Sequence, residues 1–234
     1  MSTVLPEGVL YLVGTPIGNL GDLSPGVLDR LRSAGVVCAE DTRRTRKLLT
    51  AFDIHPSRLI SVRAENEQGA IDRVMAWLAG GDDVVLVSDA GMPGLSDPGE
   101  RLVRGVLGAG GRVAVEPGPD AATTALLVSG LPAQRFCFEG FLPRRGADRE
   151  KRLAAIGAER RTSVLFESPT RLARTLGDLE RHLGEDRLIA VANDLTKLFE
   201  KVWRGPIAEV RRSLSDLSVK GEFVVVVGPV EEVV

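Results

Sequence analysis

Residues 84–99 read VVLVSDAGMPGLSDPG, a short apolar run followed directly by a loop rich in glycine and proline. The arrangement occurs twice more, where residues 9–13 lead into GTPIGNL (14–20) and residues 113–115 lead into EPGPDA (116–121). In an open parallel sheet, ligands bind beyond the carboxyl ends of the strands, where such loops converge. Glycine lets the backbone approach a ligand closely, and proline fixes the path of a loop. Together the loops predict one pocket, although each alone also fits a plain strand-to-helix turn.

The three loops contain neither lysine nor arginine. None of them fits the P-loop pattern G-x-x-x-x-G-K-[ST], and the first lacks the G-x-G-x-x-G fingerprint of dinucleotide-binding folds. The loops therefore predict a phosphate-poor ligand, held by backbone groups and by the carboxylate of Asp89.

Composition is that of an ordinary globular protein, with 234 residues, 44% apolar side chains and a formal net charge of −2. We find no apolar stretch long enough to span a bilayer and no basic-then-apolar leader, so we expect a cytoplasmic protein with no membrane partner. The two cysteines and two histidines lack metal-ligand spacing, and we expect no metal site. Basic clusters at 43–47 and 144–152 keep RNA binding open through phosphate contacts, although such runs are usually solvated helix faces.

The order of predicted elements is that of an α/β protein with two domains. An N-terminal α/β domain with a mainly parallel sheet is expected at 1–117, and a C-terminal α/β domain with a mixed sheet at 118–234, with a ligand cleft between them. The expected strands are 10–13, 36–39, 59–61, 84–88, 113–116, 136–139, 163–166, 188–192, 199–204 and 223–227. The expected helices are 25–33, 45–52, 69–79, 100–108, 121–129, 148–158, 170–183 and 207–214. The strands at 199–204 and 223–227 are expected to pair with each other.

Eight segments carry a resemblance to a known family. They are VGTPIGNLGDLS (13–24), AEDTR (39–43), LVSDAGMP (86–93) with SDPG (96–99), PGP (117–119) with Ala121, FEGFLPR (138–144), FESPTRL (166–172), LTK (195–197) and GE (221–222). With these segments in this order, the chain resembles, over essentially its whole length, the tetrapyrrole methylase superfamily of S-adenosylmethionine-dependent methyltransferases. The resemblance is greatest to members that act on ribosomal RNA.

The resemblance implies a fold of two α/β domains with S-adenosyl-L-methionine bound between them, usually in a homodimer. It also implies 2′-O-methylation of a cytidine ribose in the decoding region of 16S rRNA, in the small ribosomal subunit. By family position, the cofactor-binding residues are expected to be Pro16, Asp89, Gly91, Met92, Ser96, Pro117, Gly118, Asp120, Ala121, Leu142 and Pro143.

The acceptor side of the site is predicted at the end of the second strand. A ribose hydroxyl is a weak nucleophile, so a nearby carboxylate base would assist it. Glu40 and Asp41 are the candidates for this role, with Arg43 holding a phosphate. The alternative is that Asp41 caps the following helix and Arg43 is a surface residue. Glu167 is a second candidate, with the alternative that it holds backbone in the second domain.

Two other functions stay open. One is a methyltransferase of the same superfamily that acts on a tetrapyrrole or a protein acceptor. The other is a non-catalytic relative that binds RNA or senses the cofactor. The basic clusters favour RNA over a tetrapyrrole, and retention of the Asp89 loop favours an enzyme over a binding module.

Overall fold

The structure is a computed structural model that describes residues 7–63, 66–215 and 220–230. Internal contacts divide the chain into two compact units, one ending at Asp120 and the other beginning at Ala121. The division expected from the sequence was between residues 117 and 118. Each unit is described by itself below.

The first unit is built on a five-stranded sheet in the order β3-β2-β4-β1-β5 with all strands parallel. Its strands are β1 (Val9–Val13), β2 (Val36–Ala39), β3 (Arg58–Ser61), β4 (Val84–Val87) and β5 (Arg112–Glu116). Every residue of β2 and β4 is buried, as their continuous apolar sequences VVCA and VVLV require for strands covered on both faces.

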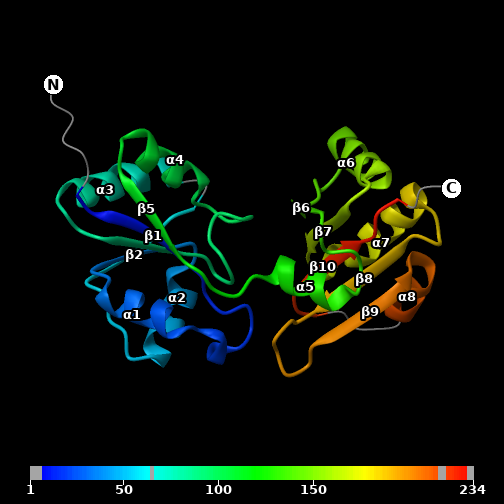
Figure 1. The fold of residues 1–234 in the computed structure, drawn as a ribbon, viewed down its shortest axis with the longest axis horizontal. Coiled ribbons are helices and arrows are strands. Elements are labelled where there is room, and N and C mark those ends of the chain that lie inside the picture. Colours follow the sequence, from blue (N-terminus) through cyan, green and yellow to red (C-terminus); the bar gives the residue numbers. More distant parts are fainter. Residues whose placement is uncertain (1–6, 64–65, 216–219, 231–234) are drawn as a thin grey trace. The chain divides into compact units, whose positions relative to one another are not determined.

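Helices cover both faces of this sheet (Figure 1). One face carries α1 (Pro25–Ser33) and α2 (Thr42–Ala51), and the other carries α3 (Glu67–Ala79) and α4 (Glu100–Gly108). The chain therefore leaves the neighbouring strands β1 and β4 toward opposite faces, into α1 and α4. This divergence is the topological switch point at which open α/β sheets bind ligands.

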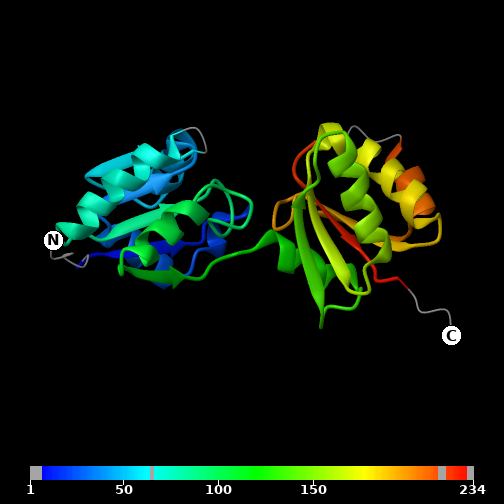
Figure 2. The ribbon, with the colours of Figure 1, turned by 90° about the horizontal axis from the view of Figure 1, so that it is seen from above.

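The second unit has a mixed five-stranded sheet in the order β6-β7-β10-β8-β9, in which only β6 and β7 are parallel. Its strands are β6 (Phe136–Phe141), β7 (Thr162–Glu167), β8 (Leu188–Asn193), β9 (Lys201–Pro206) and β10 (Phe223–Val227). One face packs against α6 (Ala147–Ala158), α7 (Pro169–Leu183) and α8 (Ile207–Ser215), and the other against α5 (Ala121–Ser129) (Figure 2).

The α/β class is confirmed, and the sheet is parallel in the first unit and mixed in the second, as expected. At the start of α1, the Ser24 hydroxyl accepts a hydrogen bond from the Val27 amide at 3.2 Å. The predicted pairing of the ninth and tenth strands is wrong. β8 lies between them and pairs with both. The expected strand start at Phe199 is also wrong, since this residue lies in the β8–β9 loop and is 75% exposed.

One predicted helix start is wrong by three residues. α2 begins at Thr42 rather than at residue 45, because Asp41 caps it. α4 begins at residue 100, as predicted, and its N-cap is Gly99 at φ +137°. A short 3-10 helix, η1 (Leu20–Asp22), lies in the loop after β1. Among the residues described, no helix combines the length and apolarity needed to cross a membrane.

Candidate functional site

The loops after β1 and β4 are joined by hydrogen bonds at the carboxyl edge of the first sheet. The Thr15 amide donates to the Gly91 carbonyl at 2.9 Å, and the Gly91 amide donates back to the Thr15 carbonyl at 3.1 Å. The Thr15 hydroxyl donates a hydrogen bond to the Ser88 carbonyl at 3.3 Å, and the Ser88 hydroxyl donates one to the Gly91 carbonyl at 3.1 Å. Gly91 has φ +81°, a conformation that favours glycine.

Gly14 and Gly118 bring the loops after β1 and β5 into direct backbone contact. A Cβ atom added to Gly14 would lie 2.6 Å from the Cα of Gly118 and 2.7 Å from the sulfur of Met92. A Cβ atom added to Gly118 would lie 2.8 Å from the carbonyl carbon of Gly14. Both positions therefore require glycine, and the three Gly/Pro-rich loops of the sequence meet at one edge.

Asp89 connects this edge to the start of α2. Its Oδ1 accepts a hydrogen bond from the Asp41 amide at 3.0 Å, and its Oδ2 lies 3.3 Å from Nη1 of Arg44. A backbone amide and a guanidinium thus hold the carboxylate in place, and Asp89 is partly exposed to solvent.

Two further carboxyl groups lie in the electrostatic field of Asp89. Burial, together with the charges of Asp97 and Asp89, raises the pKa of the Glu40 carboxyl, although Arg44 and Arg63 oppose the shift. Burial is also the main cause that raises the pKa of Asp97, and the Asp89 charge adds to it. Like charge therefore adds to the effect of burial at both carboxyls, and a cation at this edge would oppose it.

Asp41 and Arg43 pair with each other at the N-terminus of α2. The Asp41 carboxylate accepts a hydrogen bond from the Arg43 amide at 2.8 Å and lies 3.2 Å from the Arg43 guanidinium. The hydrogen bonds from Arg43 lower the pKa of Asp41 to about 2. This is the capping arrangement that the sequence left open as the alternative to catalysis.

The structure places the other predicted cofactor residues in two groups. Pro16, Met92, Ser96, Pro117 and Asp120 lie on the three loops of the first unit, with Ser96 and Pro117 exposed and the others half-buried. Ala121, Leu142 and Pro143 belong to the second unit. Their part in a shared site stays a prediction.

Leu142 and Pro143 lie in a loop after β6 that is held by arginine side chains. Arg171 donates to the Leu142 carbonyl at 2.6 Å, and Arg149 donates to the Pro143 carbonyl at 3.0 Å. The third arginine, Arg174, donates to the carbonyl of the next loop residue at 3.3 Å. Three consecutive carbonyls of the loop thus each have a guanidinium donor.

Buried acids hold two of these arginines. Arg149 is 1% exposed and donates to Asp178 at 2.8 Å, so it fits neither alternative left open for the 144–152 cluster, RNA contact or a solvated helix face. Glu167 is buried, pairs with Arg171 at 3.3 Å and accepts hydrogen bonds from the Thr175 hydroxyl at 2.6 Å and a backbone amide at 2.8 Å. These contacts favour the backbone-holding alternative for Glu167.

Four residues of the site had no individual role in the sequence analysis. They are Thr15 and Ser88, whose hydroxyls tie the loops together, Arg44, which pairs with Asp89, and Asp97, whose pKa is raised. A signal existed for Asp97, which lies within the SDPG end of the opening loop, but Asp-Pro before a helix is typical of a cap. Nothing in the local sequence indicates that Arg44 rather than Arg43 contacts Asp89.

As a chemical environment, the edge offers backbone donors and acceptors together with carboxylates. Its three loops have no cationic side chain. Such a donor set suits a ligand that carries positive charge and no phosphate.

Comparison with known proteins gives a consistent result. The family model of the Tetrapyrrole (Corrin/Porphyrin) Methylases matches residues 9–211. The ribosomal RNA small subunit methyltransferase I of Xylella fastidiosa (strain Temecula1) is 46% identical over 222 residues, which cover 94% of this chain and 81% of that protein. The protein of the same name from Bacillus subtilis (strain 168) is 42% identical over 220 residues, covering 94% of this chain and 75% of that protein.

Solved structures share the fold at low sequence identity. Cobalt precorrin-4 methyltransferase, a cobalamin biosynthetic enzyme, matches with a TM-score of 0.68 at 16% identity, covering 94% of both chains. Uroporphyrin-III C-methyltransferase from Thermus thermophilus, solved in complex with S-adenosylhomocysteine, matches with a TM-score of 0.65 at 20% identity and covers 94% of this chain and 97% of its own. The predicted fold class is confirmed.

Proposed function

The chain belongs to the tetrapyrrole (corrin/porphyrin) methylase family, and on this premise we propose that it is an S-adenosylmethionine-dependent methyltransferase that 2′-O-methylates a cytidine ribose of the 16S rRNA. The observation that carries the proposal is the meeting of three cation-free Gly/Pro loops at the switch point of a parallel sheet, beside the Asp89 carboxylate. The names of the curated relatives support ribosomal RNA as the acceptor.

The first unit fits the proposed cofactor. S-adenosylmethionine carries a sulfonium, an amino group and a carboxylate but no phosphate, so it needs no lysine or arginine cradle. Burial is the main cause that raises the pKa values of Glu40 and Asp97, and the charge of Asp89 adds to both shifts, so a bound cation would favour the ionised form of each carboxyl. We assign cofactor binding to Asp89, Gly91 and the other loop residues predicted from the family, with Leu142 and Pro143 contributed by the second unit.

The chemistry divides between cofactor and protein. S-adenosylmethionine supplies an electrophilic methyl group on a positively charged sulfur. The protein's part is to align a ribose hydroxyl with that methyl group, and alignment contributes about 7–11 kcal/mol in favourable intramolecular models. We assign acceptance of the hydroxyl proton to Glu40, because a carboxylate whose pKa is raised is the stronger base.

Asp41 suits this basic role less well than Glu40. Its carboxylate already accepts hydrogen bonds from Arg43, and its pKa of about 2 makes it a weak base. In this proposal Asp41 orients α2, and the exposed guanidinium of Arg43 holds a phosphate of the acceptor.

Cofactor binding is tested by calorimetry with S-adenosylmethionine on the wild type, Asp89→Ala and a control. Hydrogen bonds that involve a charged group contribute about 1.5–3 kcal/mol. Loss of the Asp89 carboxylate is therefore expected to raise the Kd by roughly 10- to 100-fold. The control is Asp82→Ala, which removes the same charge just before β4, at the other end of that strand. Wild-type protein that fails to bind would overturn the proposed enzyme function.

The acceptor is tested with labelled methyl donor and small ribosomal subunits from a strain that lacks the modification. Label is expected in 16S rRNA, at a ribose 2′ position. Transfer to a tetrapyrrole or a protein with none to the subunits would replace the proposed acceptor by the second candidate. Cofactor binding without any transfer would favour a non-catalytic relative.

The proposed partners follow from the same premise. We propose a homodimer that meets its substrate in the small ribosomal subunit, and a cytoplasmic location because the ribosome is there. Sedimentation of the purified protein, with and without small subunits, tests the dimer and the ribosomal complex separately.

A further inference from the structure

The outer face of α2 carries more positive charge than the described acids neutralise, since Arg43 pairs with Asp41 and Arg44 with Asp89. Thr42–Ala51 contains four basic residues and no acidic one, in a chain whose net charge is −2. Arg46 and Lys47 are exposed and form no ion pair with any residue that the structure describes. The charge is therefore local to this helix.

The spacing of these residues places them on one side of the helix. Arg43, Arg46, Lys47 and Thr50 follow the i, i+3, i+4, i+7 pattern, which occupies an arc of about 100° on a helix. The opposite side packs into the core through Leu49. Packing thus fixes the basic face outward.

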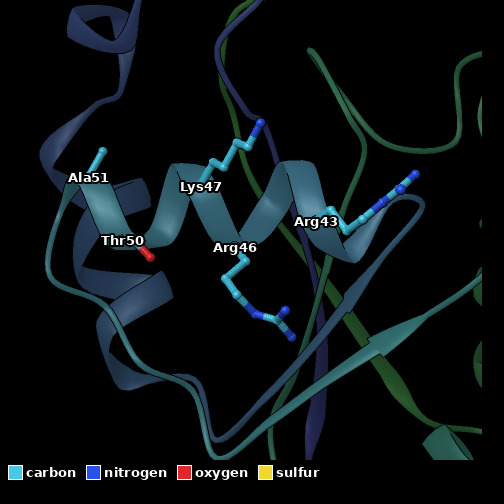
Figure 3. A pocket seen from close by; sticks show the side chains of 5 residues that line it. All are labelled: Arg43, Arg46, Lys47, Thr50 and Ala51. Atoms are coloured by element: carbon cyan, nitrogen blue, oxygen red, sulfur yellow. The ribbon is translucent and has the colours of Figure 1, made fainter.

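A hollow of about 550 Å³ opens on this face. It is lined by Arg43, Arg46, Lys47, Thr50 and Ala51, and Figure 3 shows the three basic side chains extending away from the helix. We call this lining the α2 basic face. An open hollow ringed by cations suits a ligand with several spaced anionic groups, rather than a single buried ion.

The α2 basic face begins at the candidate site. Two residues separate β2 from the helix, and Asp89 is contacted both by Arg44 in the first turn and by the amide of the N-cap residue Asp41. From Arg43 to Thr50 the helix rises about 10 Å, at about 1.5 Å per residue. That length matches about three nucleotides, at about 3.4 Å per nucleotide in a stacked strand.

We propose that the α2 basic face binds the sugar-phosphate backbone of the acceptor RNA beside the methylated nucleotide. The inference rests on the proposed function and adds the surface by which the RNA is held. Phosphate contacts position a nucleic acid without reading its sequence, so Arg46 and Lys47 act on affinity rather than on the choice of nucleotide.

The test measures methyl transfer to small subunits that lack the modification, as a function of subunit and KCl concentration. Arg46→Ala/Lys47→Ala is expected to raise the KM for subunits by about 10-fold or more and to reduce the magnitude of the log–log salt slope by about 1 to 2, at about 0.7–0.9 per lost phosphate contact. Arg46→Glu/Lys47→Glu is expected to raise the KM further. The Kd for S-adenosylmethionine and the Tm should stay at wild-type values, since both side chains are exposed.

The matched control is Arg32→Ala/Arg104→Ala, which removes two exposed charges elsewhere on the same unit. It is expected to change the KM less than 2-fold. An active Arg46→Ala/Lys47→Ala protein with unchanged KM and salt slope would overturn this inference alone. Wild-type protein that binds S-adenosylmethionine but methylates no subunits would overturn the proposed acceptor, and the inference with it.

Discussion

In the first unit, the loops contact one another mainly through their backbones. In the second unit, the loop after β6 is instead held by side chains. Gly14 and Gly118 leave no room for a Cβ atom, and Thr15 and Gly91 exchange amide hydrogen bonds. In the second unit, arginines from α6 and α7 donate to the carbonyls of residues 142–144.

The difference has two consequences. Backbone contacts depend on the absence of side chains, so the contacts between the loops of the first unit are sensitive to added volume. The arginine network depends on ionised partners, so the loop of the second unit is sensitive to charge. Removing one partner of a buried ion pair costs more than most single changes, because the other charge loses its compensation.

The largest effect is expected when Arg149 is removed. Arg149→Ala leaves Asp178, the Pro143 carbonyl and the Thr175 hydroxyl without a buried donor. Asp178 keeps the exposed Arg174 and Arg181 as partners, so we expect the free energy of unfolding of the second unit to fall by about 3 kcal/mol, the low end for a broken buried pair. Hydrogen exchange followed by mass spectrometry measures the stability of each unit separately. Amide protection should fall in β10 of the second unit and stay unchanged in β1 of the first.

Arg152→Ala is the control for this change. Arg152 lies on the same helix and pairs with Glu139 at 2.9 Å, but its side chain is exposed. Exposed pairs contribute about 1 kcal/mol or less, so protection should hardly change. Equal losses in the two variants would show that burial of the arginine is not what holds the loop.

The Arg149 network also has a defined pH dependence. Burial opposes ionisation of Asp178, but the hydrogen bonds and charges of Arg149 and Arg181 hold the pKa of its carboxyl below the usual range. When the pKa of a carboxyl is lower in the folded protein than in the unfolded chain, the carboxylate stabilises the fold at pH values above the unfolded-chain pKa. This stabilisation is lost as the pH falls through the folded-state pKa. In Arg149→Ala, the loss of second-unit stability on acidification should therefore be smaller than in the wild type.

A smaller effect is expected when a methyl group is added between the loops of the first unit. Gly14→Ala places a Cβ atom 2.6 Å from the backbone of Gly118, which must move. Overpacking of this kind costs about 1–3 kcal/mol. Protection of β1 should fall while that of β10 is unchanged, and the Kd for S-adenosylmethionine should rise.

The control for Gly14→Ala is Gly108→Ala. Gly108 ends α4, and a Cβ atom there would meet nothing within 4 Å. Alanine is favoured over glycine in a helix by up to about 1 kcal/mol, so the control should be neutral or stabilising. A Gly14→Ala protein as stable as this control, with unchanged cofactor affinity, would contradict the backbone-contact interpretation.

The backbone contacts of the first unit and the arginine network of the second also differ in how far they can be predicted from the sequence. The Gly/Pro loops follow strands that are apolar throughout, so both the sheet and the meeting of the loops could be predicted from local pattern. Arg149 could not, because arginine is rarely buried and its partner Asp178 lies on another helix. The insertion of β10 between β7 and β8 was missed for a related reason, since strand pairing across an intervening helix leaves no local signal.

The smallest expected effect is at Glu40, and its sign is opposite to that at Asp178. Burial and the neighbouring Asp97 and Asp89 raise the pKa of Glu40, so the folded protein binds its proton more tightly than the unfolded chain does. Stability is then lost as the pH rises through the window between the two pKa values. At pH 7, Glu40→Gln is expected to raise the free energy of unfolding by less than about 1 kcal/mol, because Glu40 is partly exposed and solvent screens its charge. Urea unfolding between pH 4 and 7 should show this gain disappear as the pH falls.

The same Glu40→Gln variant should lose methyl transfer while it still binds S-adenosylmethionine, which separates a proton acceptor from a residue that only shapes the loops. A Glu40→Gln protein that is less stable than the wild type at pH 7 would mean that the Glu40 carboxylate supports the edge of the sheet, as Glu167 does in the second unit.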